Sequence, residues 1–134
     1  MSDNLLRKRI LVVDDEAGIR LTLPLILGKY GFEVTSAATV ADAVKEIEAH
    51  QFDALLSDLN LPRPNEGFDV IRAMRRHQPG CVNFVLTGYP GDASAEAAIE
   101  QHVAHYFTKP VDMTELVGII LDKLGSKASS AGKD

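Results

Sequence analysis

The chain has 134 residues, 46% of them hydrophobic and 25% charged, the ordinary balance of one soluble globular domain with a single core. A formal charge of −5, with basic residues scattered apart from Arg7-Lys8-Arg9, argues against direct DNA binding. The single Cys81 rules out an internal disulfide, and no apolar stretch suits a secretory signal or a membrane helix, so we expect a cytoplasmic protein that does not bind membranes.

Short aliphatic runs alternate with longer segments of helical period, which is the pattern of successive β-α units. We expect strands over 10–13, 32–36, 54–57, 83–86 and 104–107, and helices over 17–30, 39–50, 67–77, 93–101 and 113–124. A continuous apolar run such as Ile10–Val13 suits a strand covered on both faces. The sequence therefore predicts an α/β fold, a doubly wound parallel sheet with helices on both sides.

Polar and special residues mark the expected helix ends. Thr39 and Asp112 stand where helices should begin, and both types cap helix N-termini. Three glycines follow expected helices and should release them through a left-handed conformation: Gly31, Gly80 and Gly125. Pro24 lies inside the first expected helix and should kink or interrupt it.

Polar side chains also follow the expected strands. Asp14 and Asp15 come after the first strand, Asp58 after the third, Thr87 after the fourth and Lys109 just beyond the fifth. Any one of them alone would more often be a helix cap or a solvated loop residue. Ligands of doubly wound sheets bind at the carboxyl ends of the strands, so the set together predicts a site there.

The three carboxylates of this set should repel one another unless a cation is bound between them. Oxygen ligands favour a hard divalent ion, Mg²⁺ first, with Mn²⁺ as a substitute. The remaining residues indicate phosphoryl transfer to a carboxylate. Asp58 would be the nucleophile, Lys109 and the metal would neutralise the phosphoryl oxygens, and Thr87 would donate a hydrogen bond.

Four motifs carry a resemblance to the response-regulator receiver domain (CheY-like) of two-component signalling. They are Ile10–Glu16, Asp58–Pro62, Val85–Tyr89 and Tyr106–Pro110. Their order and separations agree with that family over residues 8–124, which we take as the domain. Residues 125–134 are small and polar, and we expect a flexible tail or a truncated linker there.

The resemblance implies a flavodoxin-like sheet of five parallel strands in the order 2-1-3-4-5 with five helices. It also implies that Asp58 is phosphorylated by a histidine kinase in a Mg²⁺-dependent reaction. Asp15 matches the direct metal ligand, together with Asp58 and the backbone carbonyl of Asn60, whereas Asp14 matches an acid that binds mostly through water.

The same resemblance implies that Thr87, Gly88 and Lys109 contact the phosphoryl group. Tyr106 matches an aromatic switch that turns inward when Thr87 moves, although a tyrosine simply packed at the sheet edge is the alternative. A cis Lys109-Pro110 peptide and a phosphorylation-dependent homodimer also follow from the resemblance alone.

Two departures from the family pattern concern partner choice. The loop Pro62–Glu66 makes the interval from Asp58 to Gly67 one residue longer than in the family, and it either tunes partner choice or is a neutral insertion. Pro24 falls in a helix that often docks the kinase. The implied partners are a sensor histidine kinase or a histidine phosphotransfer protein, and a downstream protein.

Two other functions remain open from the sequence. One is a pseudo-receiver that binds partners without phosphorylation. The other is a metal-dependent phosphohydrolase with an aspartyl-phosphate intermediate, but such enzymes place a second Asp two residues after the nucleophile. Here that position is Asn60, which cannot protonate a leaving group. We therefore expect a phosphoacceptor rather than an enzyme.

Overall fold

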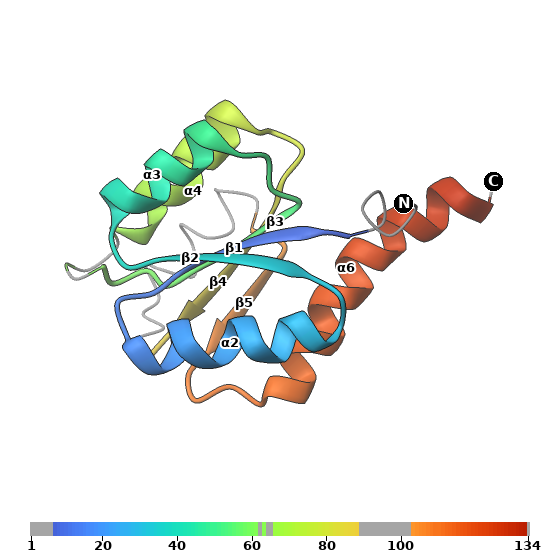
Figure 1. The fold of residues 1–134 in the computed structure, drawn as a ribbon, viewed down its shortest axis with the longest axis horizontal. Helices are drawn as coiled ribbons and strands as arrows, with labels where there is room; N and C mark the ends of the chain where they lie inside the picture. Colours follow the sequence, from blue (N-terminus) through green and yellow to red (C-terminus); the bar gives the residue numbers. More distant parts are fainter. Residues whose placement is uncertain (1–6, 62, 64–65, 89–102, 134) are drawn as a thin grey trace.

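A computed structural model describes residues 7–61, 63, 66–88 and 103–133 of the chain, and Figure 1 shows a parallel sheet between two layers of helices. The strands are β1 (Arg9–Val13), β2 (Glu33–Ala37), β3 (Ala54–Ser57), β4 (Val82–Thr87) and β5 (His105–Thr108). They pair in parallel in the order β2-β1-β3-β4-β5, which confirms the expected topology. Every strand boundary lies within one residue of its prediction.

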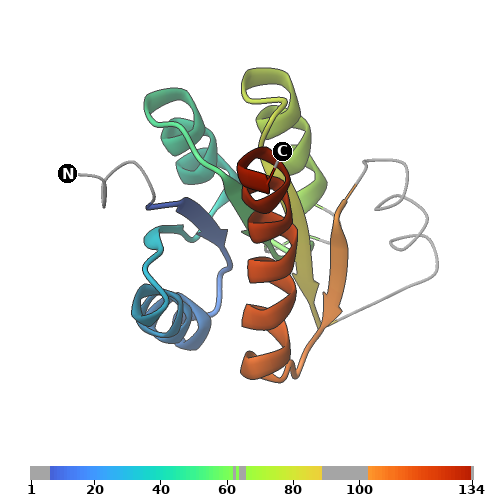
Figure 2. The same ribbon diagram turned by 90° about the vertical axis from the view of Figure 1, so that its right-hand side faces the viewer.

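Helices cover both faces of the sheet. They are α2 (Ala17–Lys29), α3 (Val40–Ala49), α4 (Gly67–His77) and α6 (Met113–Lys133). Figures 1 and 2 show α3 and α4 together on one face, and α2 and α6 on the other. The helix expected over 93–101 lies outside the described residues. None of the described helices is long and apolar enough to cross a membrane.

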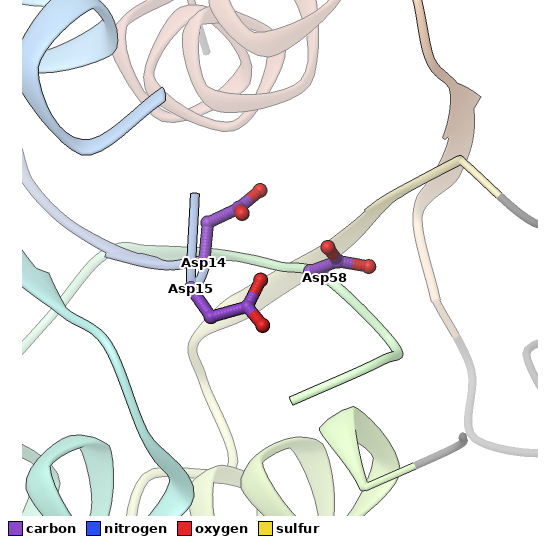
Figure 3. Close-up of side chains that lie close together, drawn as sticks. All are labelled: Asp14, Asp15 and Asp58. Atoms are coloured by element: carbon purple, nitrogen blue, oxygen red, sulfur yellow. The ribbon is translucent and has the colours of Figure 1, made fainter. Parts of the chain in front are cut away.

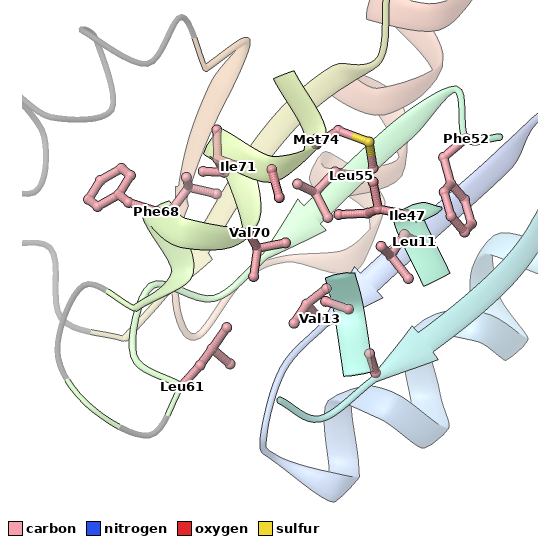
Figure 4. Packing of buried hydrophobic residues seen from close by; sticks show 14 of the residues in the cluster. Leu11, Val13, Ile47, Phe52, Leu55, Leu61, Phe68, Val70, Ile71 and Met74 are labelled. Carbon is pink, nitrogen blue, oxygen red and sulfur yellow. The ribbon is translucent and has the colours of Figure 1, made fainter. Parts of the chain in front are cut away.

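The two layers pack on the sheet through separate apolar clusters. On the α3–α4 side, Leu11 and Leu55 of the strands pack against Ile47 and Met74 of the helices (Figure 4). On the α2–α6 side, the alternate strand residues meet these helix residues: Leu23, Leu27, Leu116 and Ile120. Because β1 supplies side chains to both clusters, its residues Ile10–Val13 are all apolar and buried, as a strand covered on both faces requires.

The predicted helix starts and one glycine are confirmed. Thr39 Oγ1 accepts a hydrogen bond from the Asp42 amide (3.1 Å), and Asp112 Oδ1 accepts from the Thr114 amide (2.8 Å). Gly31 has a φ of 94°, the left-handed conformation that lets the chain turn after α2. These local signals position each helix over the sheet.

Two other expectations about helix ends are wrong, and the one about Pro24 is wrong in part. Gly80 is not left-handed: α4 ends at His77, and the buried Gln78 side chain then bonds to the Ile47 carbonyl in α3 and to the His50 carbonyl and Phe52 amide that follow α3. α2 is continuous through Pro24, so the helix is not interrupted there, and a bend at Pro24 stays a prediction. α6, expected to end before Gly125, continues to Lys133 through a proline-free stretch of small and polar residues. The domain boundary after residue 124 remains a prediction.

Gly67 brings the start of α4 against the loop that follows β3. Its amide donates to the Leu59 carbonyl (2.7 Å). A Cβ built on Gly67 would overlap the Asp58 carbonyl oxygen and would lie 2.7 Å from Leu59 Cα. Only glycine allows this close approach, which fixes the backbone of the loop after Asp58.

Gly67→Ala should therefore lower the free energy of unfolding by at least about 2 kcal/mol, because backbone atoms must move to admit the methyl group. Urea denaturation followed by circular dichroism measures this change. Gly118→Ala is the matched control, since Gly118 is exposed in α6 with open space around it and alanine there should stabilise the helix by up to about 1 kcal/mol. Equal effects of the two substitutions would contradict the prediction.

Candidate functional site

The end of β1 carries two of the predicted acids. Asp14 is buried, with 1% of its surface exposed, whereas Asp15 is exposed. The backbone fixes Asp14, because its amide donates to the Ala37 carbonyl (3.1 Å) and its Oδ1 accepts from the Glu16 amide (2.9 Å). Arg20 Nη1 also donates to the Asp14 carbonyl (2.9 Å). The Asp14 carboxylate is thus held in a defined orientation.

The third acid, Asp58, lies at the end of β3, beside β1. Its amide donates to the Val13 carbonyl (2.8 Å), which ties the two strand ends together. Asp58 is 6% exposed, and its Oδ1 accepts from the Asn60 amide (3.2 Å). The Asn60 amide therefore lies next to the carboxylate, and the role of the Asn60 carbonyl as a metal ligand stays a prediction.

Figure 3 shows Asp14 and Asp15 leaving β1 with Asp58 beside them. One carboxylate oxygen from each of the three lies within 4.8 Å of the others. The donors are all carboxylate oxygens, and the exposed Asp15 leaves one side open to water. This donor set fits a hard divalent cation such as Mg²⁺, which binds a few carboxylates and keeps several waters.

Lys109, just beyond β5, places its ammonium among these acids. Nζ lies 2.8 Å from Asp14 Oδ2, 2.7 Å from Glu16 Oε1 and 3.1 Å from Asp58 Oδ2. With Asp15 there are four carboxylates, and among the described residues the cationic groups bonded here are Lys109 and the Arg20 guanidinium, the latter through the Asp14 backbone carbonyl. The excess of negative charge attracts a further cation.

Sequence reasoning assigned no role to Glu16. The available signal was its place as the third acid in the Asp14-Asp15-Glu16 run. Its contact with Lys109 depends on a side chain reaching across to a segment 93 residues away, which strand periodicity does not specify.

Burial and charge act in opposite directions on two of these groups. Burial raises the pKa of the Asp14 carboxyl, although the Lys109 ammonium and the Glu16 amide favour its ionised form. For Lys109, burial alone would lower the pKa, but hydrogen bonds to Asp14, Glu16 and Asp58 outweigh it and raise the pKa above its ordinary value. Lys109 is therefore an ammonium at neutral pH.

The remaining predicted residues lie along β4 and β5. Thr87 is fully buried as the last residue of β4, and its carbonyl accepts from the Lys109 amide (2.8 Å). Gly88 is exposed, and a Cβ there would lie 3.9 Å from carbons of the Lys109 side chain. Tyr106 is half-buried and packs against the α3–α4 cluster. The Lys109-Pro110 peptide is cis, as the resemblance implied.

A family model described as the response regulator receiver domain matches residues 10–121. The chain belongs to this family. It is 33% identical over 116 residues to the photosynthetic apparatus regulatory protein RegA of Cereibacter sphaeroides, covering 87% of this chain and 62% of RegA. It is 31% identical over 119 residues to the transcriptional regulatory protein GlrR of Escherichia coli, covering 89% of this chain and 27% of GlrR. The chain therefore spans less than two thirds of these relatives.

Solved structures agree with this assignment. A CheY-like receiver domain protein from Methanospirillum hungatei superposes with a TM-score of 0.86 at 30% identity, covering 92% of this chain and 98% of that one. A response regulator from Burkholderia pseudomallei was solved with a phosphorylated aspartic acid and a calcium ion. It gives a TM-score of 0.78 at 27% identity, covering 92% of this chain and 72% of that one.

This receiver domain thus belongs to a family of two-component signalling proteins that generally accept a phosphoryl group rather than turn over a substrate. The cluster of Asp14, Asp15 and Asp58 is consistent with a phosphoacceptor site, and it has the ligands to bind a divalent cation.

The raised pKa of Asp14 predicts a pH-dependent cost to stability. The folded chain holds the Asp14 proton more tightly than the unfolded chain, so ionised Asp14 destabilises the fold above its raised pKa. This cost disappears as the pH falls through that value towards the ordinary 3.8. Without divalent cations, Asp14→Asn should raise the free energy of unfolding at pH 7 by on the order of 1 kcal/mol.

Urea denaturation in a chelator at pH 7 and near pH 4 checks this prediction, and the advantage of the variant should shrink at the lower pH. Asp122→Asn, at an exposed position of α6, is the control and should change stability by less than about 0.5 kcal/mol. Added Mg²⁺ should stabilise the natural chain more than Asp14→Asn. A variant less stable than the natural chain at pH 7 in the chelator would contradict the prediction.

Proposed function

We propose that Asp58 accepts a phosphoryl group from a histidine kinase or a histidine phosphotransfer protein, in the cytoplasm and in a Mg²⁺-dependent reaction, and that Thr87 and Tyr106 relay this change to a protein partner. The observation that carries the proposal is the setting of Asp58. Its carboxylate is nearly buried, contacts the Lys109 ammonium at 3.1 Å and lies within 4.8 Å of oxygens of two further acids.

In this reaction a carboxylate oxygen of Asp58 attacks the phosphorus of a phosphohistidine. The new O–P bond forms as the P–N bond breaks, and the electron pair returns to the imidazole, which takes a proton from solvent. The Asn60 amide orients the Asp58 carboxylate by donating a hydrogen bond to Asp58 Oδ1. The Lys109 ammonium, which donates to Asp58 Oδ2 before the reaction, would then donate to the phosphoryl oxygens and stabilise their negative charge.

Asp15, Asp58 and the Asn60 carbonyl would hold Mg²⁺ directly, and Asp14 would do so through water. When bound, the ion neutralises phosphoryl oxygens and lowers the repulsion between the incoming phosphoryl group and the acids. The buried Asp14 is the acid whose ionised form is already disfavoured, so it suits the more distant role.

Thr87 and Gly88 would contact the phosphoryl group at the end of β4. The support is positional, because the Thr87 carbonyl is bonded to the Lys109 amide and Gly88 lies beside the Lys109 side chain. A residue without a side chain at position 88 leaves the phosphoryl group accessible to the donor and to water.

Tyr106 would be the element that reports phosphorylation. It lies opposite Val85 in the β4–β5 register, two residues before the opposed pair Thr87 and Thr108. A movement of Thr87 towards the phosphoryl group would remove support beside the half-buried ring of Tyr106 and let it turn inward. The altered surface would then bind the downstream partner.

The outer surface of α2 would dock the kinase. Leu21 and Leu25 lie one turn apart on this helix and are 70% and 71% exposed, so together they form an apolar surface facing solvent. The helix begins directly after Asp14-Asp15-Glu16, so an apolar helix of a partner packed there would bring its phosphohistidine to the acidic site.

Incubation with Mg²⁺ and acetyl phosphate should add one phosphoryl group per chain, because the site itself supplies the acceptor and the compensating charges. Intact mass spectrometry measures the adduct, which should vanish with a chelator or in Asp58→Asn. Asp69→Asn, an exposed carboxylate of α4, is the matched control and should keep it. No adduct on folded protein would favour a pseudo-receiver, and sustained phosphate release from a monoester would favour a phosphohydrolase.

Beryllofluoride, a mimic of the bound phosphoryl group, should shift the ring resonances of Tyr106 in an NMR spectrum, and the shift should be lost in Thr87→Ala. The physical reason is that Thr87 must move before the ring has room to turn. Tyr30, which is 55% exposed at the end of α2, provides the control resonance and should not change. An unchanged Tyr106, or an equal shift in Thr87→Ala, would show that Tyr106 is only a packing residue.

Leu25→Glu should reduce phosphoryl transfer from the kinase by about tenfold or more, because a charge in the centre of an apolar interface is desolvated without a partner. Phosphorylation by acetyl phosphate should not change, since this donor needs no docking surface. Leu121→Glu, at an exposed leucine of α6, is the matched control. Equal losses with both donors would indicate a folding defect and contradict the docking role.

A further inference from the structure

Glu16 makes the shortest contact of the Lys109 ammonium. Its Oε1 lies 2.7 Å from Nζ, compared with 2.8 Å for Asp14 and 3.1 Å for Asp58. Glu16 stands at the N-cap of α2, yet its side chain makes no capping hydrogen bond there. The carboxylate is instead directed across the site to a residue 93 positions later.

Glu16 differs from the other two acids that contact Lys109. Asp14 and Asp58 belong to the set whose oxygens converge on a possible metal position, and among the described residues Glu16 does not belong to that set. A divalent cation at this position would take up the negative charge of Asp14 and Asp58 and would repel the ammonium. Glu16 would then be the contact that still attracts Lys109.

The backbone of Glu16 is itself fixed. Its amide donates to Asp14 Oδ1 (2.9 Å), and its carbonyl accepts from the Arg20 amide (3.2 Å) in the first turn of α2. The Glu16 carboxylate therefore extends from a held point, even though its side chain is 60% exposed. A held anchor of this kind can restrict where the ammonium lies.

We propose that Glu16 is a positioning residue that keeps the Lys109 ammonium beside Asp58 once a divalent cation has occupied the acidic site. The proposal rests on the phosphoacceptor function proposed above. Glu16 acts through Lys109 and does not touch the phosphoryl group. Its effect must therefore depend on the presence of the lysine.

A purely electrostatic role for Glu16 predicts the opposite result. If Glu16 only added negative charge near the site, its removal would speed the reaction with an anionic donor, whether or not Lys109 were present. Positioning predicts that the reaction slows, and only when the lysine is present. A double-mutant cycle separates the two.

The experiment measures the rate of phosphorylation by acetyl phosphate at saturating Mg²⁺. Glu16→Gln should slow it about fivefold, the effect of one partly exposed charge-assisted hydrogen bond. In a Lys109→Met background, Glu16→Gln should cause no further loss. Glu33→Gln is the matched control and should have no effect, because Glu33 pairs with Arg9 where β1 and β2 begin, at the opposite edge of the sheet. A faster reaction, no change, or the same factor in both backgrounds would overturn the proposal.

A second measurement does not depend on phosphorylation. With Mg²⁺ bound, NMR relaxation of the Lys109 side chain should show greater mobility in Glu16→Gln than in the natural chain, and unchanged mobility would overturn the proposal. If the natural chain takes no phosphoryl group but the Lys109 side chain is still more mobile in Glu16→Gln than in the natural chain, the proposed function fails and the role of Glu16 stands. If the natural chain is phosphorylated and Glu16→Gln behaves identically in both measurements, only the role of Glu16 fails.

Discussion

Mutual repulsion among carboxylates at one edge of the sheet is the constraint on which the site depends. Asp14, Asp15 and Asp58 are brought within a few ångströms of one another because the apolar strands that carry them are neighbours. Burial raises the pKa of Asp14, the nearby charge of Asp58 raises it further, and the Lys109 ammonium acts against both. Burial of the core therefore stabilises an arrangement that the acids alone would not adopt.

The rest of the structure holds this arrangement rigid. The Asp58 amide is bonded to the end of β1, and Gly67 brings α4 against the loop that follows. The buried Gln78 ties the other end of α4 to the segment between α3 and β3. The two ends of α4 are thus bonded to the segments before and after β3, so Asp58 has little freedom to relax away from the other acids.

The sequence predicted the strands and the convergence of the acids because both follow from simple periodic rules. Buried parallel strands are continuous apolar runs, and their carboxyl ends share one edge. It predicted the end of α4 at His77 but wrongly expected a left-handed Gly80, since the chain after α4 is held by long-range hydrogen bonds of Gln78, and it did not predict the course of α6 past Gly125. The contact of Glu16 with Lys109 was missed for the same reason, since long side chains choose partners in space rather than in sequence.

The order of the strands separates two mechanical tasks. β3, which carries the acceptor, is the central strand and is bonded on both sides, whereas β5 is the last strand of the sheet and, within the described part of the chain, pairs with β4 alone. Displacing an edge strand breaks backbone hydrogen bonds on one side alone. Asp58, which must keep its position, therefore follows the strand that is hardest to displace. Lys109 follows the edge strand β5, which is easier to displace.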